Sequence, residues 1–302
     1  MLNGHGRYPY SAIPERPVYD WPGGPRLALF VAINVEVFPF GAGLGVDLAP
    51  RQAEPDVVNY SWRDYGNRVG IWNLIDLLDE YRLPATVLLN TEIYDHCPEI
   101  AAAFRARAAE FVGHGRNNAE RQADMAEAEE RALLHASRDI IARHEGRAPE
   151  GWMGPWVSET ALTPDLVAEA GYRYLLDWSA DDQPLWLRTR AGTHLLSIPY
   201  SRPTNDLPQL HGAKLAAPAY ADLLIDQISE MLQQARRRPL VFNLSLHPYL
   251  VGHAFRLRHL RRVFAHIDAN REQIWIATAG EIARHVSALP EAAPSAPTQP
   301  HR

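Results

Sequence analysis

The chain has 302 residues, of which 46% are hydrophobic and 22% are charged, and its formal net charge is -6. This composition is typical of a globular protein with one large domain, and the acidic balance argues against nucleic acid or an anionic membrane as a partner. The single cysteine, Cys97, excludes an intramolecular disulfide and a thiolate metal site. With no signal-peptide pattern and no apolar run of roughly 18 residues, the expected location is cytoplasmic.

The predicted elements begin after an N-terminal arm, residues 1–25, which is rich in Pro, Gly and Tyr and is expected to wrap the surface or a neighbouring subunit. Short apolar runs predict strands at residues 27–33, 84–90, up to 114, 151–156, 172–178, 194–200, 240–246 and 273–277. Helical spacing predicts helices at residues 66–82, 98–108, 119–144, 164–170, 219–237, 255–270 and 280–286. Residues 289–302 are rich in Ala, Pro and Ser and are predicted to form a disordered tail.

This alternation of about seven strand–helix units predicts an α/β fold with a parallel sheet and helices outside it. Such a number of units over residues 26–288 favours a single barrel over a small open sheet. In folds of this kind the chemistry lies at the carboxyl ends of the strands. Polar side chains that directly follow a strand are therefore the candidates for a site.

Three ionisable residues meet this condition: Glu36, His114 and His247. Glu36 is flanked by Val35 and Val37, and a carboxylate in such a setting must find a partner or raise its pKa. The alternative is a solvated loop carboxylate and two ordinary strand-end histidines. Three converging groups of mixed type favour acid–base or metal-assisted hydrolysis.

Other polar residues near strand ends have structural alternatives as well. Asn118 can contact a ligand, but Asn117 and Glu120 beside it have the spacing of a capping box at a helix start. Asp177 can bind substrate, or cap or pair with a nearby arginine. No Gly-rich phosphate-binding fingerprint is present, which disfavours nucleotide chemistry.

A family resemblance rests on the order of five motifs. They are residues 32–36 (AINVE), 114–118 (HGRNN), 153–156 (MGPW), 199–206 (PYSRPTND) and 244–247 (LSLH). Together they resemble the polysaccharide deacetylase (NodB-like, carbohydrate esterase family 4) superfamily, and within it the branch of metal-independent allantoinases and cyclic-imide hydrolases. The resemblance spans residues 26–288 and implies a distorted (β/α)7 barrel hydrolase domain.

The resemblance also implies a catalytic Asp paired with an Arg, and a metal held by an acidic residue and two histidines. In this chain Asn34 stands at the Asp, Met153 at the Arg and Asn118 at the second histidine. Losing both members of a buried ion pair is physically coherent, because no charge is left unpaired. Glu36, His114 and Asn118 would hold any metal, and Asn118 is a poor zinc ligand. We therefore expect no tightly bound cofactor; the alternative is a weakly bound divalent metal such as zinc.

The reaction that the resemblance implies is hydrolysis of a small cyclic amide: an imide, a hydantoin-like ring or a ureide. Glu36, with His114, would position or deprotonate water, and His247 would protonate the leaving nitrogen or stabilise the oxyanion. The predicted substrate-binding residues are Asn34, Arg116, Asn118, Trp156, Asp177, Trp178, Asn205 and Asp206.

Alternatives remain for single residues and for the function. Arg116 would bind an acidic substituent or only cap a surface, and Trp156 and Trp178 would wall the pocket or only pack the barrel. The competing functions are a metal-dependent deacetylase of N-acetylated sugars and a catalytically inactive ligand-binding barrel. A homo-oligomer is also implied, so the expected partners are a small-molecule substrate and further copies of the chain.

Overall fold

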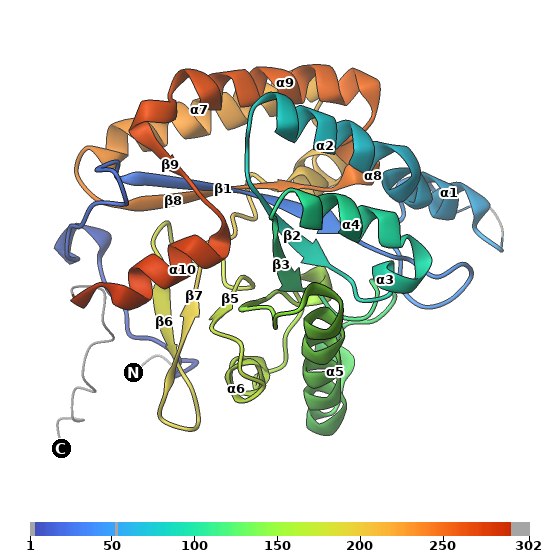
Figure 1. Ribbon diagram of the computed structural model, residues 1–302, viewed down its shortest axis with the longest axis horizontal. Coiled ribbons are helices and arrows are strands. Elements are labelled where there is room, and N and C mark those ends of the chain that lie inside the picture. The colour runs from blue at the N-terminus through green and yellow to red at the C-terminus, as the bar shows by residue number, and fades with distance from the viewer. Residues whose placement is uncertain (1–3, 52–53, 291–302) are drawn as a thin grey trace.

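A curled sheet forms the centre of the molecule (Figure 1). The computed structural model describes residues 4–51 and 54–290, and within them nine strands follow the order β6-β7-β5-β4-β3-β2-β1-β8, with β9 beside the start of β1. The strands are β1 (Leu27–Val35), β2 (Ala85–Leu89), β3 (Glu110–Gly113), β4 (Gly151–Trp152), β5 (Tyr174–Leu175), β6 (Leu185–Arg188), β7 (His194–Ser197), β8 (Leu240–Leu246) and β9 (Ile274–Ile276). The predicted α/β barrel is confirmed, in the form of a half-barrel whose edge strands are β6 and β8.

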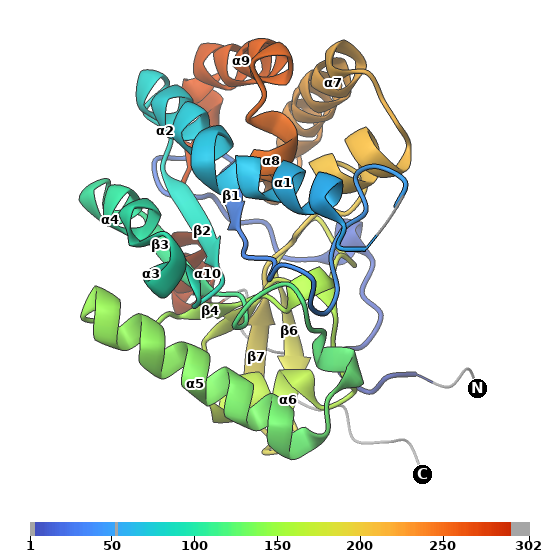
Figure 2. The same ribbon diagram turned by 90° about the vertical axis from the view of Figure 1, so that its right-hand side faces the viewer.

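Helices cover the outer face of this sheet, and Figure 2 shows α2, α9 and α7 on one side, with α4 and α5 continuing around it. The α-helices are α1 (Val57–Tyr65), α2 (Ile71–Glu80), α3 (Ile93–His96), α4 (Pro98–Ala106), α5 (Glu127–Glu145), α6 (Thr163–Glu169), α7 (Ala217–Ala235), α8 (Pro248–Val251), α9 (Ala254–Ala269) and α10 (Ala279–Ala288). Shorter turns are η1 (Ile13–Glu15), η2 (Gly66–Gly70), η3 (Gln122–Asp124), η4 (Pro155–Val157), η5 (Leu207–Gly212) and η6 (Arg271–Gln273).

Both faces of β1 are buried, which is why its sequence is apolar without alternation. Leu29 and Ile33 belong to the core cluster shared with the outer helices. Ala28 and Phe30 point to the opposite face and belong to a second cluster, which contains residues of α10. Successive side chains of β1 thus pack into two hydrophobic cores on opposite faces of the sheet.

The strand register places the candidate residues at one edge of the sheet. Val35 of β1 pairs with Leu89 of β2, which in turn pairs with Gly113 of β3. On the other side of β1, Ile33 pairs with Leu246 at the end of β8. The residues that follow these strand ends therefore emerge side by side.

Several strand and helix predictions differ from the structure. The helix predicted at 66–82 is one continuous helical segment from Val57 to Glu80, with the π-helical turn η2 between α1 and α2. Strand β6 was not predicted, and it runs antiparallel to β7, so the sheet is not wholly parallel. Apart from this pairing, the neighbouring strands of the described sheet are parallel.

The helix predicted at 119–144 begins later, at Glu127, because Gln122–Asp124 form a 3-10 turn instead. Asn117 consequently caps no helix. Its side chain accepts a hydrogen bond from the backbone N–H of Ala119 and donates one to Glu92. The capping-box interpretation of Asn117 was wrong.

The N-terminal segment from residue 4 to 25 lies against the barrel of the same chain. Arg7 pairs with Asp165 at 2.6 Å and Arg16 pairs with Asp181 at 2.7 Å. Residues 1–3, and the predicted tail from 291 onward, lie outside the described residues. In the part of the chain that is described, no helix has the length and apolar character needed to span a membrane.

Candidate active site

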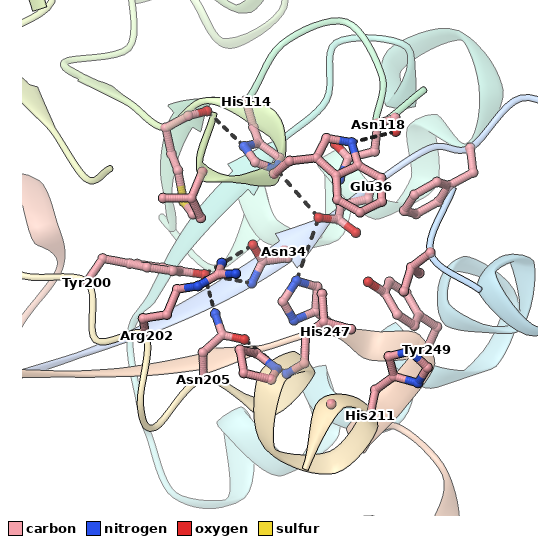
Figure 3. Close-up of a pocket in the computed structure, with 18 residues that line it drawn as sticks. Asn34, Glu36, His114, Asn118, Tyr200, Arg202, Asn205, His211, His247 and Tyr249 are labelled. Carbon is pink, nitrogen blue, oxygen red and sulfur yellow. Dashed lines mark hydrogen bonds and ion pairs between the residues drawn. The ribbon is translucent and has the colours of Figure 1, made fainter. Parts of the chain in front are cut away.

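A cavity of about 250 Å³ opens at the edge of the sheet where β1, β3 and β8 end (Figure 3). Glu36, His114 and His247 all line it. The rest of the wall consists of Asn34, Phe38, Val46, Asn118, Met153, Trp156, Val157, Tyr200, Arg202, Asn205, Leu207, Pro208, His211, Gly212 and Tyr249.

The Glu36 carboxylate lies between the imidazole rings of His114 and His247. Its Oε1 lies 3.5 Å from Nε2 of His114 and 3.7 Å from Nε2 of His247. Glu36, His114 and His247 are 7%, 1% and 5% exposed, so their charges interact with little screening by water. Among the described residues, Oε2 of Glu36 and Nε2 of His114 have no hydrogen-bond partner. Both atoms can therefore form a hydrogen bond with a bound molecule.

Each histidine is held by its other ring nitrogen. Nδ1 of His114 lies 2.8 Å from the Met153 carbonyl oxygen, which can only accept, so Nδ1 carries a proton and donates it to this carbonyl. Nδ1 of His247 lies 2.5 Å from Asp206, whose other oxygen accepts the backbone N–H of His247 at 2.6 Å. Asp206 therefore fixes both the ring and the backbone of His247.

The two central groups shift each other's pKa. Burial alone would raise the pKa of the Glu36 carboxyl, but the His247 and His114 imidazoles outweigh it and lower the pKa below its ordinary value. Burial would lower the pKa of His247, but the carboxylates of Asp206 and Glu36 raise it above its ordinary value. These directions favour an ionised Glu36 facing a protonated His247 near neutral pH.

An amide and phenol network forms one wall of the cavity. The side-chain amide of Asn34 donates to the Leu246 carbonyl at 3.2 Å, and its two terminal atoms lie 3.3 Å from the Tyr200 hydroxyl. The Asn205 amide donates to the same hydroxyl at 3.3 Å. These hydrogen bonds fix the side chain of Asn34, which stands where the family resemblance implied an acidic residue.

Asn118 and Trp156 form the opposite wall. Oδ1 of Asn118 accepts from Asn90 at 3.0 Å, and its carbonyl accepts from the Trp156 indole at 3.0 Å. Its Nδ2 has no partner among the described residues and is free to donate into the cavity. Trp156 and Val157 have φ of 67° and 54°, the left-handed region that side chains rarely adopt.

The helical segment from Val57 to Glu80 supports the site from outside. The Asn67 amide donates to the Glu36 carbonyl at 2.8 Å, and the Trp62 indole donates to the Tyr249 carbonyl at 3.1 Å. At Gly66 an added Cβ would lie 2.8 Å from the backbone nitrogen of Tyr249, and at Gly70 it would overlap the Pro248 carbonyl. Glycine is needed at both positions because the helix backbone touches the segment that follows His247.

The chain is similar to several known proteins. A family model described as polysaccharide deacetylase matches residues 53–175. A Schizosaccharomyces pombe protein assigned to the polysaccharide deacetylases is 25% identical over 287 residues, which cover 88% of this chain and 87% of the relative. The peptidoglycan deacetylase of Helicobacter pylori is 24% identical over 250 residues, covering 72% of this chain and 84% of that protein. The crystal structure of PuuE allantoinase superposes with a TM-score of 0.82 at 26% identity, covering 94% of this chain and 99% of that one.

Residues 53–175 thus match the polysaccharide deacetylase model, and the chain is similar over most of its length to proteins named as deacetylases and to an allantoinase. The sequence-based identification is thereby confirmed, including the likeness to an allantoinase. It is accordingly an enzyme of a hydrolase family that acts on carbon–nitrogen bonds.

The residues of this chain that stand at the metal-ligand positions do not fit the zinc site that the resemblance implied. Glu36 and His114 stand at two ligand positions, but at the third Asn118 offers a neutral carboxamide whose oxygen is bonded to Asn90. Structural and catalytic zinc take His, Cys or carboxylate ligands. Within residues 4–51 and 54–290, no group of three such side chains is arranged to hold a metal ion.

Four predicted substrate-binding residues do not line the cavity. Arg116 is exposed and pairs with Glu120 at 2.8 Å. Trp178 donates to Glu159, and Asp177 accepts from the backbone N–H of Gly154 at 2.9 Å, beneath the loop that carries Trp156. Burial, together with the negative charge of Glu159, raises the pKa of Asp177. The fourth residue, Asp206, lies behind His247 and positions it.

Sequence reasoning missed four polar residues of the cavity: Tyr200, Arg202, His211 and Tyr249. Tyr200 closes a predicted strand and Tyr249 follows His247 by two positions, so strand-end placement was an available signal for both. His211 belongs to the turn η5, which no periodicity indicated.

Proposed function

We propose that this enzyme hydrolyses a carbon–nitrogen bond of a small cyclic amide by acid–base chemistry, with Glu36 as the base and His247 as the acid. The observation that carries the proposal is the position of Oε1 of Glu36 between the Nε2 atoms of two anchored histidines in one cavity. The likeness to PuuE allantoinase over almost the whole chain supports the cyclic substrate.

The proposed reaction begins with a water held by Glu36 and by Nε2 of His114. Glu36 takes a proton from this water as its oxygen bonds to the ring carbonyl carbon. The carbon–nitrogen bond then breaks, and Nε2–H of His247 gives its proton to the departing nitrogen. The products are a carboxyl group and an N–H group on the opened ring. Proton exchange with solvent restores both residues.

The oxyanion formed in this step needs a donor, and we assign this role to Nδ2 of Asn118, a residue that lines the cavity. The Asn34 amide already donates hydrogen bonds to Leu246 and Tyr200, so its role is to shape the wall of the cavity. Apolar neighbours such as Phe38, Val46 and Leu207 exclude water around a ring. A cavity of about 250 Å³ suits a small ring better than a polysaccharide chain.

The test is an assay of the purified enzyme on allantoin, hydantoin, succinimide and N-acetylglucosamine oligomers, with metal analysis and added chelator. We expect ring opening that chelator does not inhibit. The variants Glu36→Gln and His247→Gln should lower kcat by about 10²- to 10⁴-fold, whereas Glu272→Gln, at an exposed carboxylate, should not change it.

Two other results would point elsewhere. Stoichiometric zinc with chelator-sensitive release of acetate from the oligomers would identify a metal-dependent deacetylase, as the name of the Helicobacter pylori relative suggests. Binding without turnover of any substrate, unaffected by Glu36→Gln, would identify an inactive binding barrel.

A further inference from the structure

Arg202 brings a positive charge to the cavity from the loop after β7. It is an exposed residue that lines the cavity, and in the view of Figure 3 its guanidinium end overlaps the end of the Tyr200 side chain. Among the described residues it makes no ion pair, and its side chain has no hydrogen-bond partner. Arg116, expected from the sequence to bind an acidic substituent, is instead neutralised by Glu120 outside the cavity.

The backbone on both sides of Arg202 is fixed. The backbone N–H of Ser201 donates to the side chain of Asn243, and the Tyr200 carbonyl accepts from Ser179 at 2.7 Å. Two residues further on, the Thr204 carbonyl accepts from the Tyr220 hydroxyl at 2.9 Å. Because the loop is anchored, only the Arg202 side chain has to order when a ligand binds, which keeps the entropic cost of recognition low.

Among residues 4–51 and 54–290, the other charges of the site pair with one another and provide no counter-ion for Arg202. The His247 cation is balanced by Asp206, which contacts its ring at 2.5 Å. Glu36 pairs with the two histidines, and no ion pair joins it to Arg202. A guanidinium stays protonated at all working pH values and presents a planar fork of N–H donors that matches a carboxylate.

We propose that Arg202 determines substrate specificity by binding a carboxylate on the substrate, so that the substrate is a small cyclic amide with an acidic substituent. This inference rests on the proposed function and narrows its substrate class. The scissile bond would lie at Glu36 and His247, and the carboxylate would lie at the Arg202 wall, so the charge orients the ring.

The experiment compares two nearly isosteric probes, hydantoin-5-acetate and hydantoin-5-acetamide. Calorimetry with the Glu36→Gln variant measures binding, and kcat/KM is measured with the unmodified site. We expect the acetate to be preferred about 10- to 100-fold. Arg202→Gln should remove this preference and leave the acetamide unaffected, Arg202→Lys should retain part of it, and Arg116→Gln should retain all of it.

The proposal is overturned if neither probe binds, if both probes bind equally well, or if Arg202→Gln weakens both to the same degree. A failure of the proposed function has a different signature. In that case the acetate would bind in an Arg202-dependent manner, but the unmodified enzyme would hydrolyse neither probe.

Discussion

Asp206 illustrates how one buried carboxylate can define the role of another residue. It contacts both the Nδ1 and the backbone N–H of His247, so the ring cannot rotate and Nε2 must face Glu36. Its negative charge also raises the pKa of His247 against the effect of burial. We therefore describe Asp206 as a positioning residue, although the sequence suggested a substrate contact.

The pH dependence of kcat/KM should report this arrangement. Activity requires an ionised Glu36, whose pKa is lowered, and a protonated His247, whose pKa is raised, so the profile should be bell-shaped with its alkaline limb above 6.5. Asp206→Asn removes one of the charges that raise the His247 pKa, so the alkaline limb should move to lower pH. An alkaline limb that stays in place in this variant would contradict the assignment, and Asp222→Asn at the exposed pair with Arg262 is the control.

Among the elements, the helical segment from Val57 to Glu80 contributes most to the geometry of the site without lining it. Its glycines allow the backbone to touch the segment after β8, and Asn67 and Trp62 hold the backbone of Glu36 and Tyr249. The position of the catalytic groups therefore depends on a helix–loop contact as well as on the strand register.

Gly70→Ala tests this dependence. Alanine favours a helix over glycine by up to about 1 kcal/mol, but here the new methyl group would overlap the Pro248 carbonyl. We expect the clash to dominate, lowering the free energy of unfolding by about 1–3 kcal/mol and reducing kcat because His247 is displaced. Denaturant unfolding and steady-state kinetics measure both effects. Unchanged kinetics would show that the contact is not needed, and Asp76→Ala on the exposed face of α2 should leave both quantities unchanged.

Elements that bury one continuous apolar run could be predicted from the sequence, and β1 and β8 were found nearly to the residue. The first part of the segment from Val57 was missed because its valines, Val57 and Val58, are exposed while the polar residues Asn59 and Arg63 are buried, so polarity in the sequence does not mark the buried face. Strand β6 was missed because it is a short edge strand that is only partly buried. The trio could be predicted because each member directly follows a strand, whereas the role of Asp206 depends on a contact 41 residues away along the chain.

At the scale of the whole molecule, the N-terminal segment is part of the barrel's packing. Trp21 is 1% exposed, its indole donates to the Leu240 carbonyl at 3.1 Å, and its ring stacks on Trp275 with centroids 5.6 Å apart. It therefore joins the start of β8 to β9, at the end of the sheet opposite the cavity.

Trp21→Ala should lower the free energy of unfolding by about 3–5 kcal/mol, since it leaves a large cavity in this packing. Urea unfolding followed by circular dichroism measures the loss. The matched control is Tyr10→Ala, because Tyr10 is 92% exposed in the same segment and should have almost no effect. Equal stability of the two variants would mean that the segment does not contribute to the fold.

The backbone of Trp156 and Val157 has a consequence for how this enzyme can change over generations. Two successive side-chain-bearing residues in the left-handed region each cost of order 1–3 kcal/mol, yet Trp156 forms the wall of the cavity. Mutants with glycine or asparagine at these positions would gain thermal tolerance while losing the shape of the pocket. Laboratory evolution for heat resistance alone should therefore discard this turn, and evolution for turnover should retain it.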